Sequence, residues 1–193
     1  FYDDKPFTKQ YLNKANGLIE KGGDWERRNR YKTYMGIYLM STRKFSEAAK
    51  LLIDCLSTFT STELATYEEV AQYSLICGSI ALSRPDLKKK LLESPEILSI
   101  NSTSEKLTPV YKLIESLHSC EYQSFFPMLL RTSNEILTKN KYLYPHANYY
   151  MRELRCRAYS QLLESYKSIS IKSMANSFGV SVEFLDADLC KFI

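Results

Sequence analysis

The residue types that most often carry out chemistry are sparse in this sequence. It contains two histidines, His118 and His146, and neither belongs to a cluster with the ligand spacing of a metal site. A Gly-x-Ser-x-Gly elbow is absent, and the Gly22-Gly23 pair lacks the lysine and the spacing of a phosphate-binding loop. The sequence therefore predicts a protein that is not an enzyme and that uses no metal and no cofactor.

The cysteines do not form a recognisable motif. Their number is odd, wide gaps separate them, and no Cys-x-x-Cys pair occurs, which argues against a disulfide framework. We expect reduced and mostly buried thiols, as in a cytosolic or nuclear protein. The five residues are Cys55, Cys77, Cys120, Cys156 and Cys190.

The densest basic cluster consists of Arg27, Arg28 and Arg30, interleaved with aromatic residues. Arginines and aromatic rings together can stack on nucleic-acid bases. However, Trp25 and Tyr31 are placed to pack, and arginines beside packed aromatic residues often pair with carboxylates of a neighbouring repeat. We favour a structural or subunit contact for these arginines and keep nucleic acid as the alternative.

Tyrosine is abundant, with 15 residues in 193. Its ring can be buried while its hydroxyl reaches water or a partner, which suits helical repeats with shallow protein-binding faces. We expect Tyr149, Tyr150 and Tyr159 to be exposed, and we take Tyr149 and Tyr150 as candidate interface residues.

Residues 170–193 have the pattern of a helix-turn-helix. Apolar residues recur at helical spacing up to Phe178, Gly179 offers a left-handed stop, and Ser181 can cap a second helix. In a DNA-binding protein this second helix would lie in the major groove, among phosphates.

The charge of that second helix argues against DNA. Glu183, Asp186 and Asp188 face a single basic residue, Lys191, and the phosphate backbone would repel three carboxylates. We therefore predict a role in protein assembly. The candidate interface residues of the two helices are Lys172, Asn176, Glu183, Asp186 and Asp188.

The elements that position these residues all show helical periodicity, and sustained strand-like alternation is absent. We expect an all-α fold: a right-handed, TPR-like helical-repeat solenoid of antiparallel helix pairs that ends in a truncated winged-helix (helix-turn-helix) subdomain. After a first stripe at residues 11–19, helices are expected over residues 24–40, 44–59, 64–82, 85–92, 107–117, 122–137 and 145–166.

The expected helices at residues 24–40 and 44–59 have tetratricopeptide-like spacing. Gly36, Phe45 and Ala48 fall where such a hairpin needs a small, an aromatic and a small residue, because helices cross closely only over short side chains. The short turn between the two helices makes them antiparallel.

We divide the chain into TPR-like repeats at residues 1–102, C-terminal repeat helices at 103–168 and the first part of a winged helix at 169–193. The polar stretch at residues 99–106 is expected to be the loop that joins the first two parts.

Composition limits the class of protein. The net charge of +4 is mild and does not require an acidic partner. No apolar run is long enough to span a bilayer and no signal-peptide pattern opens the chain, so we expect a soluble, intracellular protein without a membrane or nucleic-acid partner. The sequence begins at Phe1 and ends inside an apolar helical pattern, and we expect a fragment of a longer protein.

Four segments resemble the PCI family, whose members occur in the proteasome lid, the COP9 signalosome and initiation factor complexes. The resemblance is strongest to PCI subunits of the proteasome lid and covers nearly the whole chain. By family convention the PCI module would span about residues 33–193 and beyond. The segments are GGDWERRNR (22–30), LSTFTSTE (56–63), YSQLLESYK (159–167) and MANSFGVSVEFL (174–185).

The resemblance implies a non-catalytic scaffold within a hetero-oligomer. Winged helices of such subunits join side by side into a horseshoe, near a deubiquitinase and the ATPase ring, in cytoplasm and nucleus. It also implies that wing strands and a C-terminal helix would follow the second helix. A COP9 signalosome scaffold subunit and a nucleic-acid-binding winged-helix protein are the alternatives.

Overall fold

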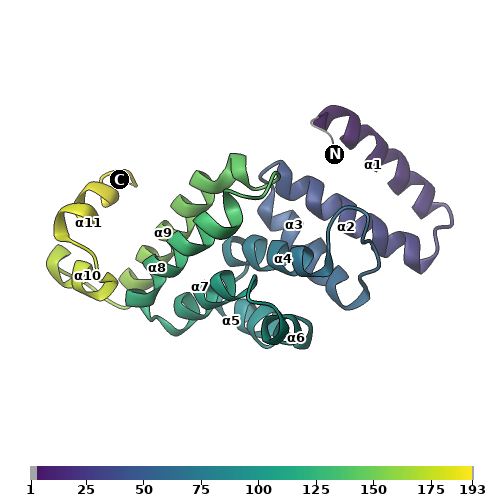
Figure 1. Cartoon of the computed structure of the whole chain (residues 1–193). Coiled ribbons are helices and arrows are strands. Elements are labelled where there is room, and N and C mark those ends of the chain that lie inside the picture. The colour runs from purple at the N-terminus through teal and green to yellow at the C-terminus, as the bar shows by residue number, and fades with distance from the viewer. Residues whose placement is uncertain (1–3, 193) are drawn as a thin grey trace. The chain divides into compact units, whose positions relative to one another are not determined.

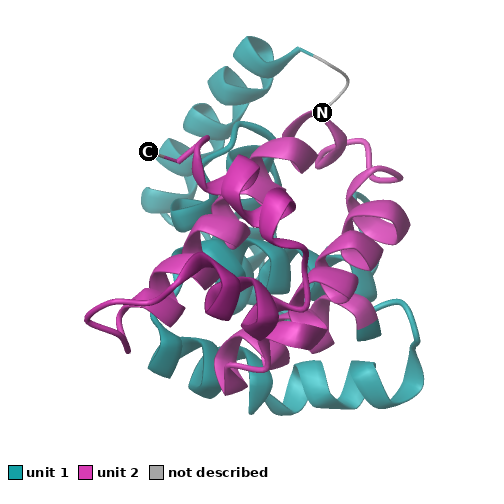
Figure 2. Ribbon diagram, turned by 90° about the vertical axis from the view of Figure 1, so that its left-hand side faces the viewer, with its two compact units in different colours: residues 1–108 teal, residues 109–193 magenta. Residues whose placement is uncertain are grey.

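A computed structural model describes residues 4–192. They form two compact units, unit 1 up to Thr108 and unit 2 from Pro109 (Figures 1 and 2). All regular structure within residues 4–192 is helical, which confirms the predicted all-α class. Ile193, the last residue of the predicted winged-helix segment, lies outside the described residues.

Unit 1 is built from consecutive helices that pack on their neighbours in the chain: α1 on α2, α2 on α3 and α3 on α4. A short α-helix, α5, continues directly into a π-helical turn, η2. The elements are α1 (Lys5–Glu20), α2 (Trp25–Ser41), α3 (Phe45–Cys55), the 3-10 turn η1 (Leu56–Thr58), α4 (Tyr67–Ala81), α5 (Arg84–Leu87), η2 (Lys88–Leu92) and α6 (Pro95–Thr103).

Side-chain caps set the starts of the helices in unit 1. The carboxylate of Asp24 accepts a hydrogen bond from the backbone N–H of Arg27 and starts α2, as the sequence predicts. Thr66 and Glu69 form a reciprocal capping box at the start of α4. Because this box fixes Thr66 as the cap, α4 begins after the expected position 64.

The α2 and α3 helices cross closely at Gly36. A Cβ atom at Gly36 would lie 2.8 Å from both Cγ and Cδ2 of Leu52, so only a residue without a side chain fits the present packing. Ala48, the other predicted small residue, is completely buried on α3. Lys32 of α2 pairs with Asp54 of α3 at the edge of the same contact.

The expected loop at residues 99–106 is wrong over its first half, because α6 extends to Thr103. Ile97 and Ile100 are buried and hold this helix on unit 1. Its hydroxyl residues do not break the helix, since Ser102 and Thr103 donate hydrogen bonds to the carbonyl oxygen of Ser99 one turn earlier.

Unit 2 contains the longest of the four segments that resemble the PCI family, residues 174–185. Its helix α8 continues into a π-helical turn, and two short helices end the chain. The elements are α7 (Thr108–Ser119), α8 (Tyr122–Thr132), the π-helix η3 (Ser133–Leu137), the 3-10 turn η4 (Tyr144–His146), α9 (Ala147–Leu163), α10 (Ile171–Phe178) and α11 (Val182–Leu189).

The α10 and α11 helices form the predicted helix-turn-helix. Gly179 ends α10 with φ 66° and ψ 31°, the left-handed conformation that glycine adopts without strain. Ser170 and Ser181 cap the two helices through their hydroxyl oxygens, which accept hydrogen bonds from the N–H groups of Ser173 and Phe184.

Candidate protein-interaction surfaces

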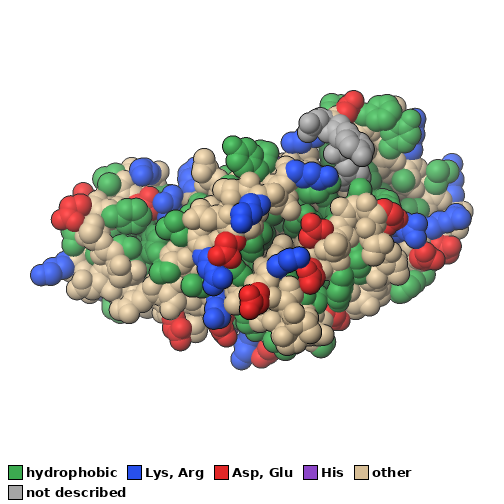
Figure 3. All heavy atoms as spheres, in the orientation of Figure 1, with side chains coloured by type: hydrophobic (Ala, Val, Ile, Leu, Met, Phe, Trp, Pro, Cys, Tyr) green, Lys and Arg blue, Asp and Glu red, His purple; other side chains and the backbone are tan. Residues whose placement is uncertain are grey.

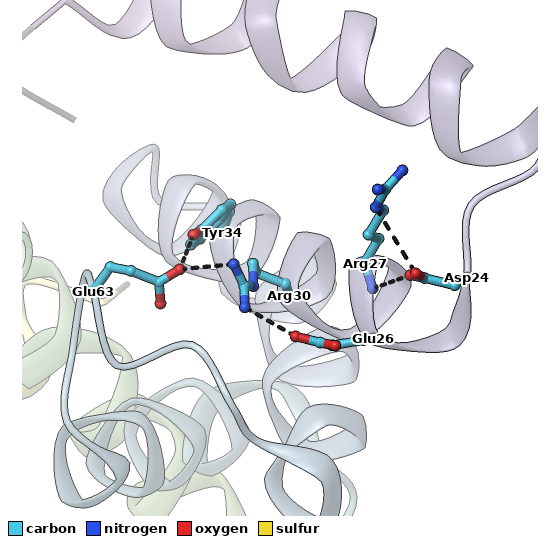
Figure 4. A network of polar contacts seen from close by, with 6 residues as sticks. All are labelled: Asp24, Glu26, Arg27, Arg30, Tyr34 and Glu63. Atoms are coloured by element: carbon cyan, nitrogen blue, oxygen red, sulfur yellow. Dashed lines mark hydrogen bonds and ion pairs between the residues drawn. The ribbon is translucent and has the colours of Figure 1, made fainter.

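The arginines of α2 differ sharply in what they contact. Arg30 Nη2 lies 3.0 Å from Glu26 Oε1, and its Nη1 lies 3.4 Å from Glu63 Oε1 in the connection before α4. Tyr34 donates a hydrogen bond of 2.7 Å to the same Glu63 oxygen. This network, drawn in Figure 4, ties the connection to α2, which is the structural use of arginine that the sequence indicated.

Titration behaviour reflects this network. Partial burial and the hydrogen bond to Glu63 raise the pKa of Tyr34 to about 12. The pKa of the Glu63 carboxyl is lowered, first by a backbone hydrogen bond and then by the Tyr34 hydroxyl. Both shifts favour the pairing of a neutral tyrosine with a charged carboxylate at neutral pH.

Arg27 and Arg28 are more open to solvent than Arg30. Arg27 has one ion pair within residues 4–192, 3.9 Å to the exposed Asp24, and Arg28 is exposed without a polar side-chain partner in that range. The expectation that Trp25 packs is wrong, since 64% of its surface is exposed. These side chains of the first turns of α2 are therefore available for an intermolecular contact.

The tyrosine predictions need correction. Tyr150 and Tyr159 are buried, and Tyr149 is half-buried. Their helix α9 is covered on the face that carries residues 150, 154 and 158, so Tyr150 belongs to the core of unit 2 rather than to an interface.

The acidic helix α11 presents two carboxylates, not three. Glu183 and Asp186 are exposed, but Asp188 is 1% exposed and is bonded within unit 2, which corrects its assignment as a surface residue. Its Oδ2 accepts a hydrogen bond of 2.9 Å from the Tyr159 hydroxyl, and its Oδ1 lies 3.3 Å from Arg155 Nη1. The buried Asp188 carboxylate thus joins α11 to two residues of α9.

An aromatic cluster supports the helix-turn-helix beneath these charges. Phe178 packs edge-on against Tyr159 and Phe126, with ring centroids 5.1 and 5.7 Å apart. Phe126 also contacts Phe184, which remains partly exposed. On α10, Lys172 and Asn176 point to solvent. The outer surface of this element therefore combines apolar, acidic and basic side chains.

Sites for chemistry are not evident in the part of the chain that the structure describes. No group of three or more His, Cys, Asp or Glu side chains could hold a metal ion there. A helix long and apolar enough to cross a membrane is likewise absent from residues 4–192. On the face seen in Figure 3, basic and acidic side chains are intermixed and no broad basic field appears.

All five cysteines lie within the described residues as free thiols. The expectation of mostly buried thiols holds for Cys55 and Cys77, whereas Cys120 is half-buried and Cys156 and Cys190 are exposed. Burial raises the pKa of both Cys55 and Cys77, so these two thiols are poorly reactive.

Part of each unit matches a known family model. Residues 1–90 match the family model of the 26S proteasome subunit RPN7, and residues 130–193 match that of the PCI domain. Between them the two models leave only residues 91–129 unmatched. The second match contains the helix-turn-helix of α10 and α11.

Individual relatives are similar in sequence along the whole chain. The 26S proteasome regulatory subunit RPN7 of Saccharomyces cerevisiae is 54% identical over 193 residues, and rpn7 of Schizosaccharomyces pombe is 51% identical over 192. The 26S proteasome non-ATPase regulatory subunit 6 homolog of Arabidopsis thaliana is 44% identical over 193 residues. Each alignment covers all of this chain but 45%, 48% and 49% of the respective relative, so the chain spans about half the length of these proteins.

Proposed function

We propose, from the matches of residues 1–90 to the RPN7 family model and of residues 130–193 to the PCI domain, that the chain belongs to the RPN7 family and is part of a non-catalytic scaffold subunit of the proteasome lid. In this role it supports assembly of the regulatory particle, and thereby ubiquitin-dependent protein degradation, through protein–protein contacts. The observation that carries the proposal is the 54% identity to RPN7 of Saccharomyces cerevisiae along the entire chain.

The finer parts of this proposal concern partners and place. We assign other PCI-containing lid subunits as direct partners, with the deubiquitinase and ATPase-ring subunits as neighbours, in cytoplasm and nucleus. The proposed module comprises repeats at residues 1–102, helices at 103–168 and the first part of a winged helix at 169–193. The exposed Arg27, Arg28, Lys172, Asn176, Glu183 and Asp186 are the side chains that we expect to contact other subunits.

The geometry of the basic cluster favours protein over nucleic acid. Arg30, one of the three arginines, is already occupied by Glu26 and Glu63. The exposed carboxylates of α11 would oppose a phosphate backbone at the helix-turn-helix. A scaffold that binds proteins accounts for both features.

Affinity purification of the tagged full-length protein tests the proposal. We expect co-purification of lid subunits, identified by mass spectrometry. Recovery of COP9 signalosome subunits in their place would assign the chain to that complex and would reject the lid. Salt-sensitive retention of labelled DNA or RNA in a filter-binding titration, lost in Arg27→Gln/Arg28→Gln, would instead support the nucleic-acid alternative.

A further inference from the structure

A groove of about 300 Å³ lies between α1 and α2 in unit 1. Leu12, Ala15, Leu18 and Ile19 of α1 form one wall, and Tyr31 and Tyr34 of α2 contribute to the other. The walls are mainly apolar, and Leu18 is 71% exposed at the rim. An apolar side chain that is this exposed beside a groove offers contact area to a partner.

The charge of the groove is one-sided. Arg27 and Arg30 line it, and none of the described lining residues is acidic. Burial raises the pKa of Tyr31 and the nearby Glu20 raises it further, but the Glu20 carboxylate accepts a hydrogen bond of 2.8 Å from Asn16. The groove therefore joins an apolar surface to positive charge.

The two guanidinium groups are not equivalent. Arg30 is neutralised by Glu26 and Glu63, whereas the one ion pair of Arg27 with another described residue is the 3.9 Å contact with Asp24, and the Arg27 side chain is 76% exposed. In Figure 4, Arg27 projects away from the network of Arg30, toward the neighbouring helix. Arg27 is thus the cation in the groove that can form an ion pair with a carboxylate of another molecule.

We propose that this groove binds an amphipathic helix of another protein, with aliphatic or aromatic residues on one face and a carboxylate that pairs with Arg27. A groove between two helices accepts a third helix through side chains spaced by three or four residues. Its volume is at the lower end of the range for small-molecule sites, so a few side chains from one helical face fill it better than a whole ligand. The inference does not depend on the complex to which the chain belongs.

A designed peptide tests this inference on the whole chain. The probe is a fluorescein-labelled, acetylated and amidated helix of about four turns, with leucine along one face and glutamate along its borders. We expect saturable binding in fluorescence anisotropy. In ¹H–¹⁵N correlation spectra the perturbed amides should centre on Ala15, Ile19, Gly22 and Gly23.

Matched variants separate specific from general attraction. Arg27→Gln should weaken binding about twofold to fivefold, the range for exposed ion pairs, and Leu18→Ser about tenfold, from lost apolar burial. Arg28→Gln removes the same charge one residue away, outside the groove lining, and should leave the affinity for this peptide unchanged, because the contacts proposed above for Arg28 are with other subunits and not with the groove. A peptide with glutamine for glutamate should bind more weakly and be insensitive to Arg27→Gln.

Equal effects of Arg27→Gln and Arg28→Gln would overturn the proposal, because general charge attraction would then explain binding. Perturbed amides outside the groove, or no binding at all, would also overturn it. Circular dichroism of each variant confirms that the helical fold is retained. These outcomes are independent of lid co-purification, so either idea can fail alone.

Discussion

The Tyr159 hydroxyl donates a hydrogen bond of 2.9 Å to Asp188 Oδ2, and this buried contact joins α9 to α11. Burial and the hydrogen bond to Asp188 raise the pKa of Tyr159, so the hydroxyl keeps its proton and remains a donor. Arg155 and Lys191 add positive charge at Asp188 Oδ1, at 3.3 and 3.7 Å. The second helix of the helix-turn-helix is therefore positioned by a polar contact as well as by apolar packing.

Removing either side of this contact should destabilise unit 2 by different amounts. We expect Asp188→Ala to lower the free energy of unfolding by about 3 to 5 kcal/mol, because Arg155 loses its buried partner. Tyr159→Phe should cost about 1 to 3 kcal/mol, since one hydrogen bond to a charged group is lost. Urea unfolding followed by circular dichroism measures both. Asp186→Ala, on the same helix but exposed, should stay within about 0.5 kcal/mol; equal losses at 186 and 188 would contradict the assigned role.

A second prediction concerns the crossing of α2 and α3. Gly36→Ala places a Cβ 2.8 Å from the Leu52 side chain, and overpacking of this kind should cost about 1 to 3 kcal/mol of unfolding free energy. Leu52→Ala in the same background should cost less than it does alone, because the added methyl fills part of the cavity.

The control for Gly36 is another helical glycine. Gly17 lies within α1 and has no atom within 4 Å of an added Cβ. We expect Gly17→Ala to stabilise the chain by about 0.5 to 1 kcal/mol through helix propensity. If Gly36→Ala were equally stabilising in urea unfolding, the helices would not cross where the structure places them.

Local signals explain why much of the fold could be predicted from the sequence. Asp24, Gly179 and Ser181 act on the backbone within four residues of themselves, so their roles can be predicted without knowledge of the tertiary structure. Apolar spacing likewise predicted the helix pairs. The loop expected at residues 99–106 was wrong over its first half, because the burial of Ile97 and Ile100 outweighs the preference of serine for turns.

The candidate interface was harder to predict, because burial depends on partners distant in the chain. Asp188 and Tyr159 are separated by 29 residues, and no local pattern announces their hydrogen bond. Tyr150 follows the half-buried Tyr149 directly in the sequence, yet it is 1% exposed. Arg30 was predicted to bridge to a neighbouring carboxylate. Only the folded connection before α4 shows that this carboxylate is Glu63.

A third prediction concerns the left-handed stop at Gly179. Gly179→Ala should lower the free energy of unfolding by about 1 to 2 kcal/mol, because the residue has φ 66°. Steric contact does not contribute, since an added Cβ would lie 3.9 Å from the nearest side-chain atom, Gln123 Cγ. Gly179→Asn should cost less than alanine, as asparagine tolerates this conformation better. A larger loss for asparagine in thermal or urea unfolding would point to crowding instead.

A fourth prediction concerns alkaline pH. The pKa of Tyr34 is raised from 10.0 to about 12 in the folded chain, so between these values the folded state binds more protons than the unfolded state. Its stabilising contribution is therefore present below pH 10 and is lost as pH rises toward 12. Tyr159 and other tyrosines act in the same direction, and the test is a difference between variants. From the same linkage, we expect the free energy of unfolding of Tyr34→Phe to fall less steeply than that of the parent chain between about pH 9 and pH 12. Urea unfolding at each pH measures the two slopes. Identical slopes would show that Tyr34 does not make this contribution.

The last prediction concerns the order in which the thiols react. Cys156 and Cys190 are exposed, so both should react rapidly with a disulfide reagent such as DTNB under native conditions. Cys77 is completely buried on α4 and burial raises its pKa, so its modification requires unfolding of unit 1. Mass spectrometry after timed labelling measures the order, and Cys156→Ser with Cys190→Ser should abolish the fast phase. Fast labelling of Cys77 in the native chain would show that α4 opens readily, and the close packing of α3 on α4 would then not be the stable core of this unit.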